Sequence, residues 1–153
     1  MKKAFFLFAA ILFTFVVSAQ VDLSGSWKLN TSKSKLGDQF SMAPKEVIIV
    51  QNGNDMSVEK HSEFQGQEFN QKDNYTLDGK ECVNDGFMDS KKKSTVTWAT
   101  DKKSLKVVSK IPMQDQEMTM TEVYKMDGGN MVIESGMSSS FGDMNETQVY
   151  DKM

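Results

Sequence analysis

The 153-residue sequence contains no arginine, because all 18 of its basic residues are lysine. It has one histidine, His61, and one cysteine, Cys82. Without arginine, no planar guanidinium can hold a carboxylate or phosphate through two parallel hydrogen bonds. Without a second cysteine, no disulfide can form within the chain, so its stability must come from packing.

The same scarcity limits the chemistry that the side chains can perform. A Ser-His-Asp or Cys-His site would have to use His61, and the local alternation turns His61 away from Met56 and Val58, toward solvent. A zinc site needs three or four His, Cys or carboxylate ligands, which His61 and Cys82 do not supply. No glycine-rich phosphate loop precedes a helix. We therefore expect no catalytic residues, no metal and no cofactor.

The chain begins with an apolar segment. Lys2 and Lys3 precede residues 4–17, which carry no charge, and Val17-Ser18-Ala19 has the small-x-small pattern of a cleavage site. This pattern predicts a secretory signal peptide over residues 1–19, cleaved near Ala19, and hence a secreted or bacterial periplasmic protein. The apolar run is shorter than the ~20 residues that a membrane-spanning helix needs, so we expect no membrane insertion after cleavage.

Residues 20–153 are long enough for one domain with its own core. They carry 16 basic and 21 acidic side chains, a net charge of −5. Such a surface does not attract nucleic acid, and we expect a monomer whose partner is a small hydrophobic or neutral ligand. The lysine runs at 91–93 and 102–103 are local, and we interpret them as solvated hairpin positions.

Turn signals recur at short intervals, among them QNGND at 51–55, LDGK at 77–80 and DGGN at 127–130. The runs between them are rich in Val, Ile, Thr, Tyr, Phe and Met, which is typical of an antiparallel meander. Such a meander leaves two exposed edges unless it closes on itself. The sequence therefore predicts an all-β fold, an antiparallel up-and-down β-barrel of 8–10 strands.

Alternation along each run indicates which side chains face the lumen, and some of these positions are polar. The shared faces are Phe69, Gln71, Asp73 and Tyr75; Met118, Met120, Glu122 and Tyr124; and Gln148 with Tyr150. A polar group on a buried face costs about 1–3 kcal/mol unless it has a partner, so several together indicate a wet or ligand-filled interior. A bulge would turn the same groups outward, and this alternative stays open.

The stretch DLSGSWKLN at 22–30, with Gly25-Ser26-Trp27, resembles the G-x-W signature on the first strand of lipocalins and related calycins. The resemblance implies that Trp27 closes one end of the barrel as a structural plug. TMTEVYKMDGGNMVIES at 119–135 and TQVYDKM at 147–153 resemble the late hairpin and last strand of the fatty-acid-binding branch. Nearly all of residues 20–153 also resemble secreted bacterial lipocalin-like domains.

Three departures from these families bear on the ligand. The fatty-acid-binding branch uses an Arg-x-Tyr pair to bind a carboxylate; Tyr150 matches the Tyr, but Gln148 stands where the Arg would be. That branch also inserts two helices after its first strand, whereas the composition of residues 31–45 predicts a loop, which implies a barrel without a helical lid. Lipocalins pack an Arg over the Trp, and here Lys152 or Gln148 would have to substitute for it.

The favoured hypothesis is a secreted barrel that holds a small apolar or neutral ligand in its lumen. Its candidate ligand contacts are Phe69, Gln71, Tyr75, Met118, Met120, Tyr124, Gln148 and Tyr150. Amide and phenol groups favour a neutral or hydroxylated ligand over a free carboxylate. The main alternative is a filled barrel that acts as a structural or interaction domain through its loops.

Two further alternatives are less favoured. The 12 methionines include Met118 and Met120 on one face, which with His61 or Trp98 nearby would suit Cu(I), but methionine more often fills irregular cores. Asp73 and Glu122 would suit acid–base catalysis if they shared one cleft, but hydrogen-bonded carboxylates of a barrel interior are the commoner case.

Overall fold

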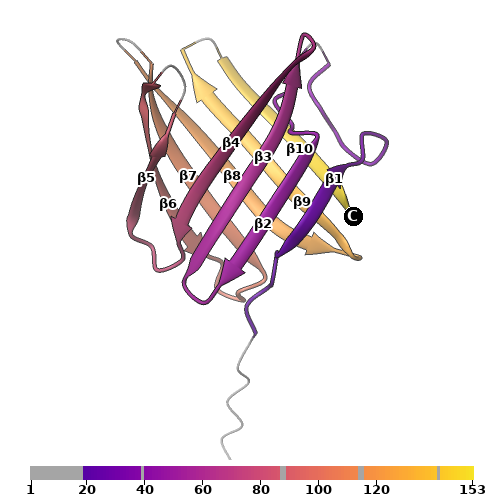
Figure 1. Ribbon diagram of the computed structural model, residues 1–153. Coiled ribbons are helices and arrows are strands. Elements are labelled where there is room, and N and C mark those ends of the chain that lie inside the picture. The colour runs from indigo at the N-terminus through magenta and orange to yellow at the C-terminus, as the bar shows by residue number, and fades with distance from the viewer. Residues whose placement is uncertain (1–18, 39, 87–88, 114–115, 141) are drawn as a thin grey trace, which may run out of the picture.

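The computed structural model describes residues 19–38, 40–86, 89–113, 116–140 and 142–153, and this part of the chain consists of ten antiparallel strands with no α-helix (Figure 1). The strands are β1 (Gly25–Leu29), β2 (Glu46–Asn52), β3 (Asp55–Phe64), β4 (Gln67–Thr76), β5 (Glu81–Asp85), β6 (Lys91–Trp98), β7 (Ser104–Met113), β8 (Gln116–Asp127), β9 (Asn130–Ser139) and β10 (Gly142–Lys152). The expected signal peptide, residues 1–19, lies outside the described residues apart from Ala19. None of the described residues belongs to a helix that is long and apolar enough to cross a bilayer.

The strands form one sheet that curls into a nearly closed barrel. Its order is β4-β3-β2-β1-β10-β9-β8-β7-β6-β5, so strands that follow each other in sequence pair, except β4 and β5, and β1 also pairs with β10. The prediction of an up-and-down barrel of 8–10 strands is therefore confirmed. The connection between β1 and β2, residues 30–45, forms turns and an isolated bridge in its described residues rather than a helical lid.

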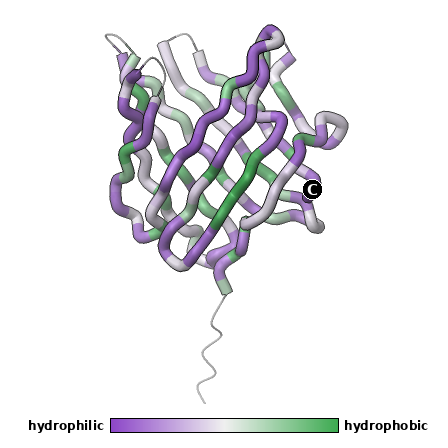
Figure 2. The backbone as a smooth tube through the Cα atoms, in the orientation of Figure 1, coloured by the Kyte–Doolittle hydropathy of each residue, from purple (hydrophilic) through white to green (hydrophobic). Residues whose placement is uncertain are grey.

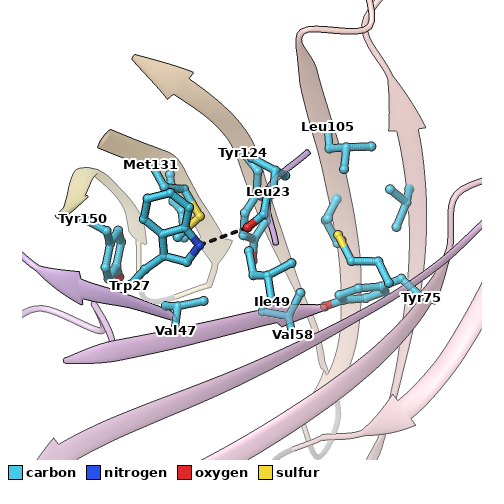
Figure 3. Packing of buried hydrophobic residues seen from close by; sticks show 14 of the residues in the cluster. Leu23, Trp27, Val47, Ile49, Val58, Tyr75, Leu105, Tyr124, Met131 and Tyr150 are labelled. Carbon is cyan, nitrogen blue, oxygen red and sulfur yellow. Dashed lines mark hydrogen bonds between the residues drawn. The ribbon is translucent and has the colours of Figure 1, made fainter. Parts of the chain in front are cut away.

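The Gly-x-Trp stretch on β1 closes one end of the barrel. Trp27 is fully buried, and its indole Nε1 donates a 3.0 Å hydrogen bond to the carbonyl oxygen of Leu23 (Figure 3). Gly25 has a φ of +147°, which side-chain-bearing residues rarely adopt, and a Cβ there would lie 3.4 Å from the indole. The ammonium of Lys152 lies 5.6 Å from the centre of the Trp27 ring, so Lys152 takes the position expected of an arginine.

The apolar core surrounds this plug. Its fully buried members come from most of the strands and include Val47, Ile49, Val58, Leu105, Val107, Met131 and Ile133. Figure 2 shows hydrophilic residues over much of the barrel wall and a hydrophobic stretch on β2. Successive residues of a strand point to opposite faces of the sheet, so the hydrophobic stretch of β2 has an inner and an outer side. Ile49 faces the core, whereas Val50 is 58% exposed.

The barrel is incomplete at one seam, where the edge strands β4 and β5 face each other. Side chains join the two strands there. The Asn84 amide accepts a 2.8 Å hydrogen bond from the Asn74 backbone N–H and donates a 3.0 Å bond to the Asn74 carbonyl oxygen. The Thr76 backbone N–H lies 3.1 Å from the Cys82 sulfur. Asn84 thus supplies the donor and acceptor that a neighbouring backbone would otherwise provide.

We expect the Asn84→Ala substitution to loosen this seam. The change removes both hydrogen bonds to Asn74 and should lower the free energy of unfolding by about 1–3 kcal/mol. In hydrogen exchange, the Asn74 amide should lose protection. Asn70→Ala, at an exposed position of β4, removes an asparagine that makes neither bond and is the control. Equal exchange of the Asn74 amide in the two variants would contradict this account of the seam.

Candidate functional site

Strand register places the inward side chains of β8, β9 and β10 in rows across the wall. Met120, Met137 and Met144 form one row, because each is paired with the next. Glu122, Ser135 and Glu146 form the next row, followed by Tyr124, Ile133 and Gln148, and then by Met126, Met131 and Tyr150. The wall therefore changes from thioether to charged, then aromatic, then apolar side chains toward the Trp27 end.

A cavity of about 140 Å³ opens beside the first two rows. Its apolar lining consists of Met42, Pro44, Phe69, Met120, Met137 and Met144. Its polar lining consists of Lys60, Ser62, Gln71, Glu122, Ser135, Glu146 and Gln148. These residues come from β3, β4, β8, β9, β10 and the 30–45 connection, so the cavity lies in the lumen, away from the Trp27 plug.

Lys60 and Glu122 form an ion pair across the lumen. Lys60 Nζ donates a 2.5 Å hydrogen bond to Glu122 Oε1, and both side chains are about nine-tenths buried. Burial lowers the pKa of Lys60, but Glu122 and other neighbours outweigh this and hold that pKa above its ordinary value of 10.5. The second oxygen, Glu122 Oε2, is buried and finds no hydrogen-bond partner among the described residues.

A second ion pair joins Lys92 to Asp73, and it corrects one prediction. Lys92 is 1% exposed and donates a 2.6 Å hydrogen bond to Asp73 Oδ2, which also accepts a 3.1 Å bond from the Tyr75 hydroxyl. Burial lowers the pKa of Lys92, and Asp73 offsets part of that shift. The interpretation of residues 91–93 as uniformly solvated was therefore wrong for Lys92, because the alternation of β6 turns the middle lysine inward.

The Lys92→Met substitution should destabilise the fold strongly. It leaves the Asp73 carboxylate buried without a counter-charge, which typically costs about 3–5 kcal/mol. Urea unfolding would measure the loss, and Lys91→Met, one residue away and exposed, should leave the midpoint nearly unchanged. Adding Asp73→Asn to Lys92→Met should recover part of the loss. Equal midpoints for the two lysine variants would show that the Lys92–Asp73 pair contributes nothing.

Gln148 and its neighbours form a chain of hydrogen bonds that contains no cation. Gln148 Nε2 donates to Glu146 Oε2 at 3.0 Å, and Gln148 Oε1 lies 3.0 Å from the Tyr150 hydroxyl. The same hydroxyl lies 3.2 Å from the Pro44 carbonyl oxygen, so its one proton serves either acceptor. The other Glu146 oxygen accepts a 3.0 Å bond from the Gly37 backbone N–H. This end of the cavity thus presents a carboxylate rather than a cation.

All three tyrosines are buried, and burial raises the pKa of each. The Glu122 and Asp73 carboxylates raise the pKa of Tyr124 further. Its hydroxyl lies near Glu122, but among the described residues it finds no partner in good hydrogen-bond geometry. The three phenols therefore stay neutral at physiological pH, and they differ in whether their hydroxyl has a partner.

This difference predicts opposite outcomes for two matched substitutions. Tyr75→Phe removes the hydrogen bond to Asp73 and should lower the free energy of unfolding by about 1.5–3 kcal/mol, as for bonds to charged groups. Tyr124→Phe removes a hydroxyl without a partner and should change it by less than about 0.5 kcal/mol, or stabilise the fold. Equilibrium urea unfolding distinguishes the two cases, and a larger loss for Tyr124→Phe would contradict the assignment.

The structure divides the predicted ligand contacts into two groups. Phe69, Gln71, Met120 and Gln148 line the cavity together. Tyr75, Tyr124 and Tyr150 are buried away from its lining, and Met118 lies outside it, two residues before Met120. His61 pairs with Glu59 at 2.8 Å and is half-buried.

Sequence reasoning missed four residues of the interior: Lys60, Lys92, Met144 and Glu146. A signal for most of them was present. Lys60 continues the face of Met56 and Val58, and Met144 and Glu146 continue the face of Gln148 and Tyr150. The positive charge of the lysines concealed this alternation signal, because a lysine on a strand is normally assigned to solvent.

No protein-family model matches the chain, and no curated protein sequence is significantly similar to it. Solved structures do resemble it. Zebrafish ileal bile acid-binding protein, complexed with cholic acid, superposes with a TM-score of 0.58 at 17% identity, covering 85% of this chain and 98% of that one. Echinococcus granulosus fatty-acid-binding protein 1 gives 0.58 at 12% identity, covering 86% and 97%.

A secretory abundant heat soluble protein from Ramazzottius varieornatus gives a TM-score of 0.62 at 16% identity, covering 86% of this chain and 95% of that one. These likenesses are in fold, because the identities are low. They confirm the calycin-like β-barrel that the Gly25-Ser26-Trp27 stretch predicts.

Proposed function

We propose that the protein is a secreted carrier that binds a small apolar or neutral, hydroxyl-bearing molecule in its lumen. The observation that supports this most is the cavity of about 140 Å³, in which the thioether and aromatic lining meets the polar side chains of Gln71, Glu122 and Gln148. Carboxylate and amide groups can form hydrogen bonds with a ligand hydroxyl inside the cavity.

The cavity sets the size of the ligand. It is smaller than the roughly 300–1,000 Å³ of sites for drug-sized molecules, and it resembles an engineered apolar cavity of about 150 Å³ that binds benzene. A ligand of that size fits without rearrangement. A ligand with a longer chain would extend out of the cavity between Phe69 and Met42, which line its mouth and are each about half exposed.

The charges of the cavity favour a neutral ligand over a carboxylate. Two carboxylates, Glu122 and Glu146, line it with one ammonium, and that ammonium already pairs with Glu122. A ligand carboxylate would enter beside two like charges and meet no arginine. The named ligands of two similar folds, a bile acid and fatty acids, support a lumen that takes small molecules, but their acidic groups do not suit these walls.

Catalysis by Asp73 and Glu122 is less well supported. Each carboxylate is held by its own lysine, Lys92 and Lys60, in a buried pair. Two of the structures that share the fold are named as binding proteins. The filled-barrel alternative has support of its own, since ion pairs and tyrosines occupy most of the lumen below the cavity.

A first experiment is native mass spectrometry of the protein purified from its host without detergent. The chain should have the mass of residues 20–153, which would demonstrate the cleaved leader, and should carry a reproducible extra mass.

A second experiment titrates 1-hexanol and hexanoate while following methionine methyl groups by carbon-13 NMR. Hexanol should shift the methyl signals of Met120, Met137 and Met144. It should bind about tenfold or more tightly than hexanoate, because burying the hexanoate charge beside two carboxylates is unfavourable. A tenfold difference in affinity corresponds to about 1.4 kcal/mol.

A cavity-filling variant provides the control. Ser135→Leu places a larger side chain among Glu122, Ser135 and Glu146 and should abolish the hexanol shifts, whereas Ser138→Leu, exposed on the same strand, should not. If hexanol shifts none of the three methyls in the unsubstituted protein, the filled-barrel alternative replaces the carrier.

A further inference from the structure

Methionine is abundant in this chain, and the mouth of the cavity gathers it in an unusual way. Met120, Met137 and Met144 lie side by side on three adjacent strands, with Met120 paired to Met137 and Met137 paired to Met144. All three line the cavity, together with Met42 from the 30–45 connection. Four thioether sulfurs therefore belong to one pocket. We call Met120, Met137 and Met144 the methionine row.

The geometry of the row permits the sulfurs to converge on one point. Residues directly opposite each other on antiparallel strands have Cβ atoms about 4.5–5.5 Å apart. Methionine is unbranched and has three rotatable bonds, so neighbouring thioethers can approach one centre without a backbone change. The three side chains are only half-buried, unlike Met56 and Met131 of the core, which leaves them reachable from the mouth.

The electrostatics of the next row favour a single positive charge. Glu122 and Glu146 lie directly beneath the methionine row on β8 and β10, separated by Ser135. Lys60 compensates one of these carboxylates, so the ionisable groups that line the cavity carry a net charge of −1. A monovalent cation at the thioethers would balance that charge.

We propose that the methionine row is a binding site for a soft monovalent metal ion, Cu(I) or its analogue Ag(I), with Met42 as an additional sulfur ligand. Thioethers are soft ligands and select Cu(I) over hard cations such as Mg²⁺ or Ca²⁺. In the described ranges, no group of three His, Cys, Asp or Glu side chains is placed to hold a metal, so sulfur alone defines the selectivity. Of the residues first considered for copper, Met120 belongs to the methionine row, whereas Met118, His61 and Trp98 lie outside the cavity lining.

The test compares two triple variants, both in a Cys82→Ser background because a free thiol also binds these ions. The first replaces the row, M120L/M137L/M144L. The second, M118L/M126L/M131L, removes three thioethers from elsewhere on β8 and β9. Methionine-to-leucine changes nearly conserve volume, so both variants should fold.

Ag(I) is titrated while methionine methyl groups are followed by carbon-13 NMR, and Cu(I) affinity is measured anaerobically by competition with a chromogenic Cu(I) chelator. In the background protein, Ag(I) should shift the methyls of the methionine row and leave those of Met131 and Met153 unmoved. The row variant should bind about tenfold or more weakly, and the second variant should match the background. Shifts confined to other methionines, or equal affinity of the two variants, would overturn the proposal.

The outcome is separable from that of the carrier function. Leucine preserves the apolar wall, so the row variant should still bind hexanol, and the methyl group of Met42, which lines the same cavity, reports that binding. A background protein that binds hexanol but not Ag(I) would refute the metal site alone, and one that binds Ag(I) but not hexanol would refute the carrier function alone.

Discussion

Closure of the barrel depends on charges buried inside it. Lys60 on β3 reaches Glu122 on β8, and Lys92 on β6 reaches Asp73 on β4. Both pairs join the half of the sheet formed by β1–β4 to the half formed by β5–β10, and the second passes across the seam between the edge strands. Because the chain has no arginine and only one cysteine, two lysines link the two halves of the sheet, a role that disulfides fill in many small secreted domains. The position of the cavity follows, since it occupies the space left beside the Lys60–Glu122 pair.

Much of the fold was predictable from local patterns. Alternation placed Asp73, Tyr75, Glu122, Gln148 and Tyr150 on inward faces, and all five are buried. Recurrent turns predicted a meander, and the need to remove exposed edges predicted its closure. These arguments need only neighbours in sequence.

The site was predictable only in part, because its content depends on register. Phe69, Gln71, Met120 and Gln148 could be assigned inward, but nothing local shows that they meet at one cavity. The pairing of Lys92 with Asp73 depends on strands that are not neighbours in the sheet. A lysine in a strand is also normally expected to face solvent. Only the carboxylate on the other side of the lumen shows that Lys92 is buried as part of an ion pair. Met137 and Met144 acquire meaning only once β8, β9 and β10 are aligned.

The likeness to a bile acid-binding and a fatty-acid-binding protein is one of fold, and the interior chemistry of this chain depends on its own side chains. Gln148 and Glu146 give one end of the lumen a neutral and an anionic group beside Tyr150. These residues occupy alternate positions of β10, so they change the lumen without a change in strand order.

The side-chain bonds of the seam have a consequence for the behaviour of the protein at high concentration. Edge strands of an open sheet offer unpaired backbone groups to other chains, and this is a common route to aggregation. Here Asn84 and Cys82 occupy backbone groups of Asn74 and Thr76 from within the same molecule. Side chains of β5 thereby cover backbone groups of the β4 edge, which are then not free to pair with a second copy of the chain.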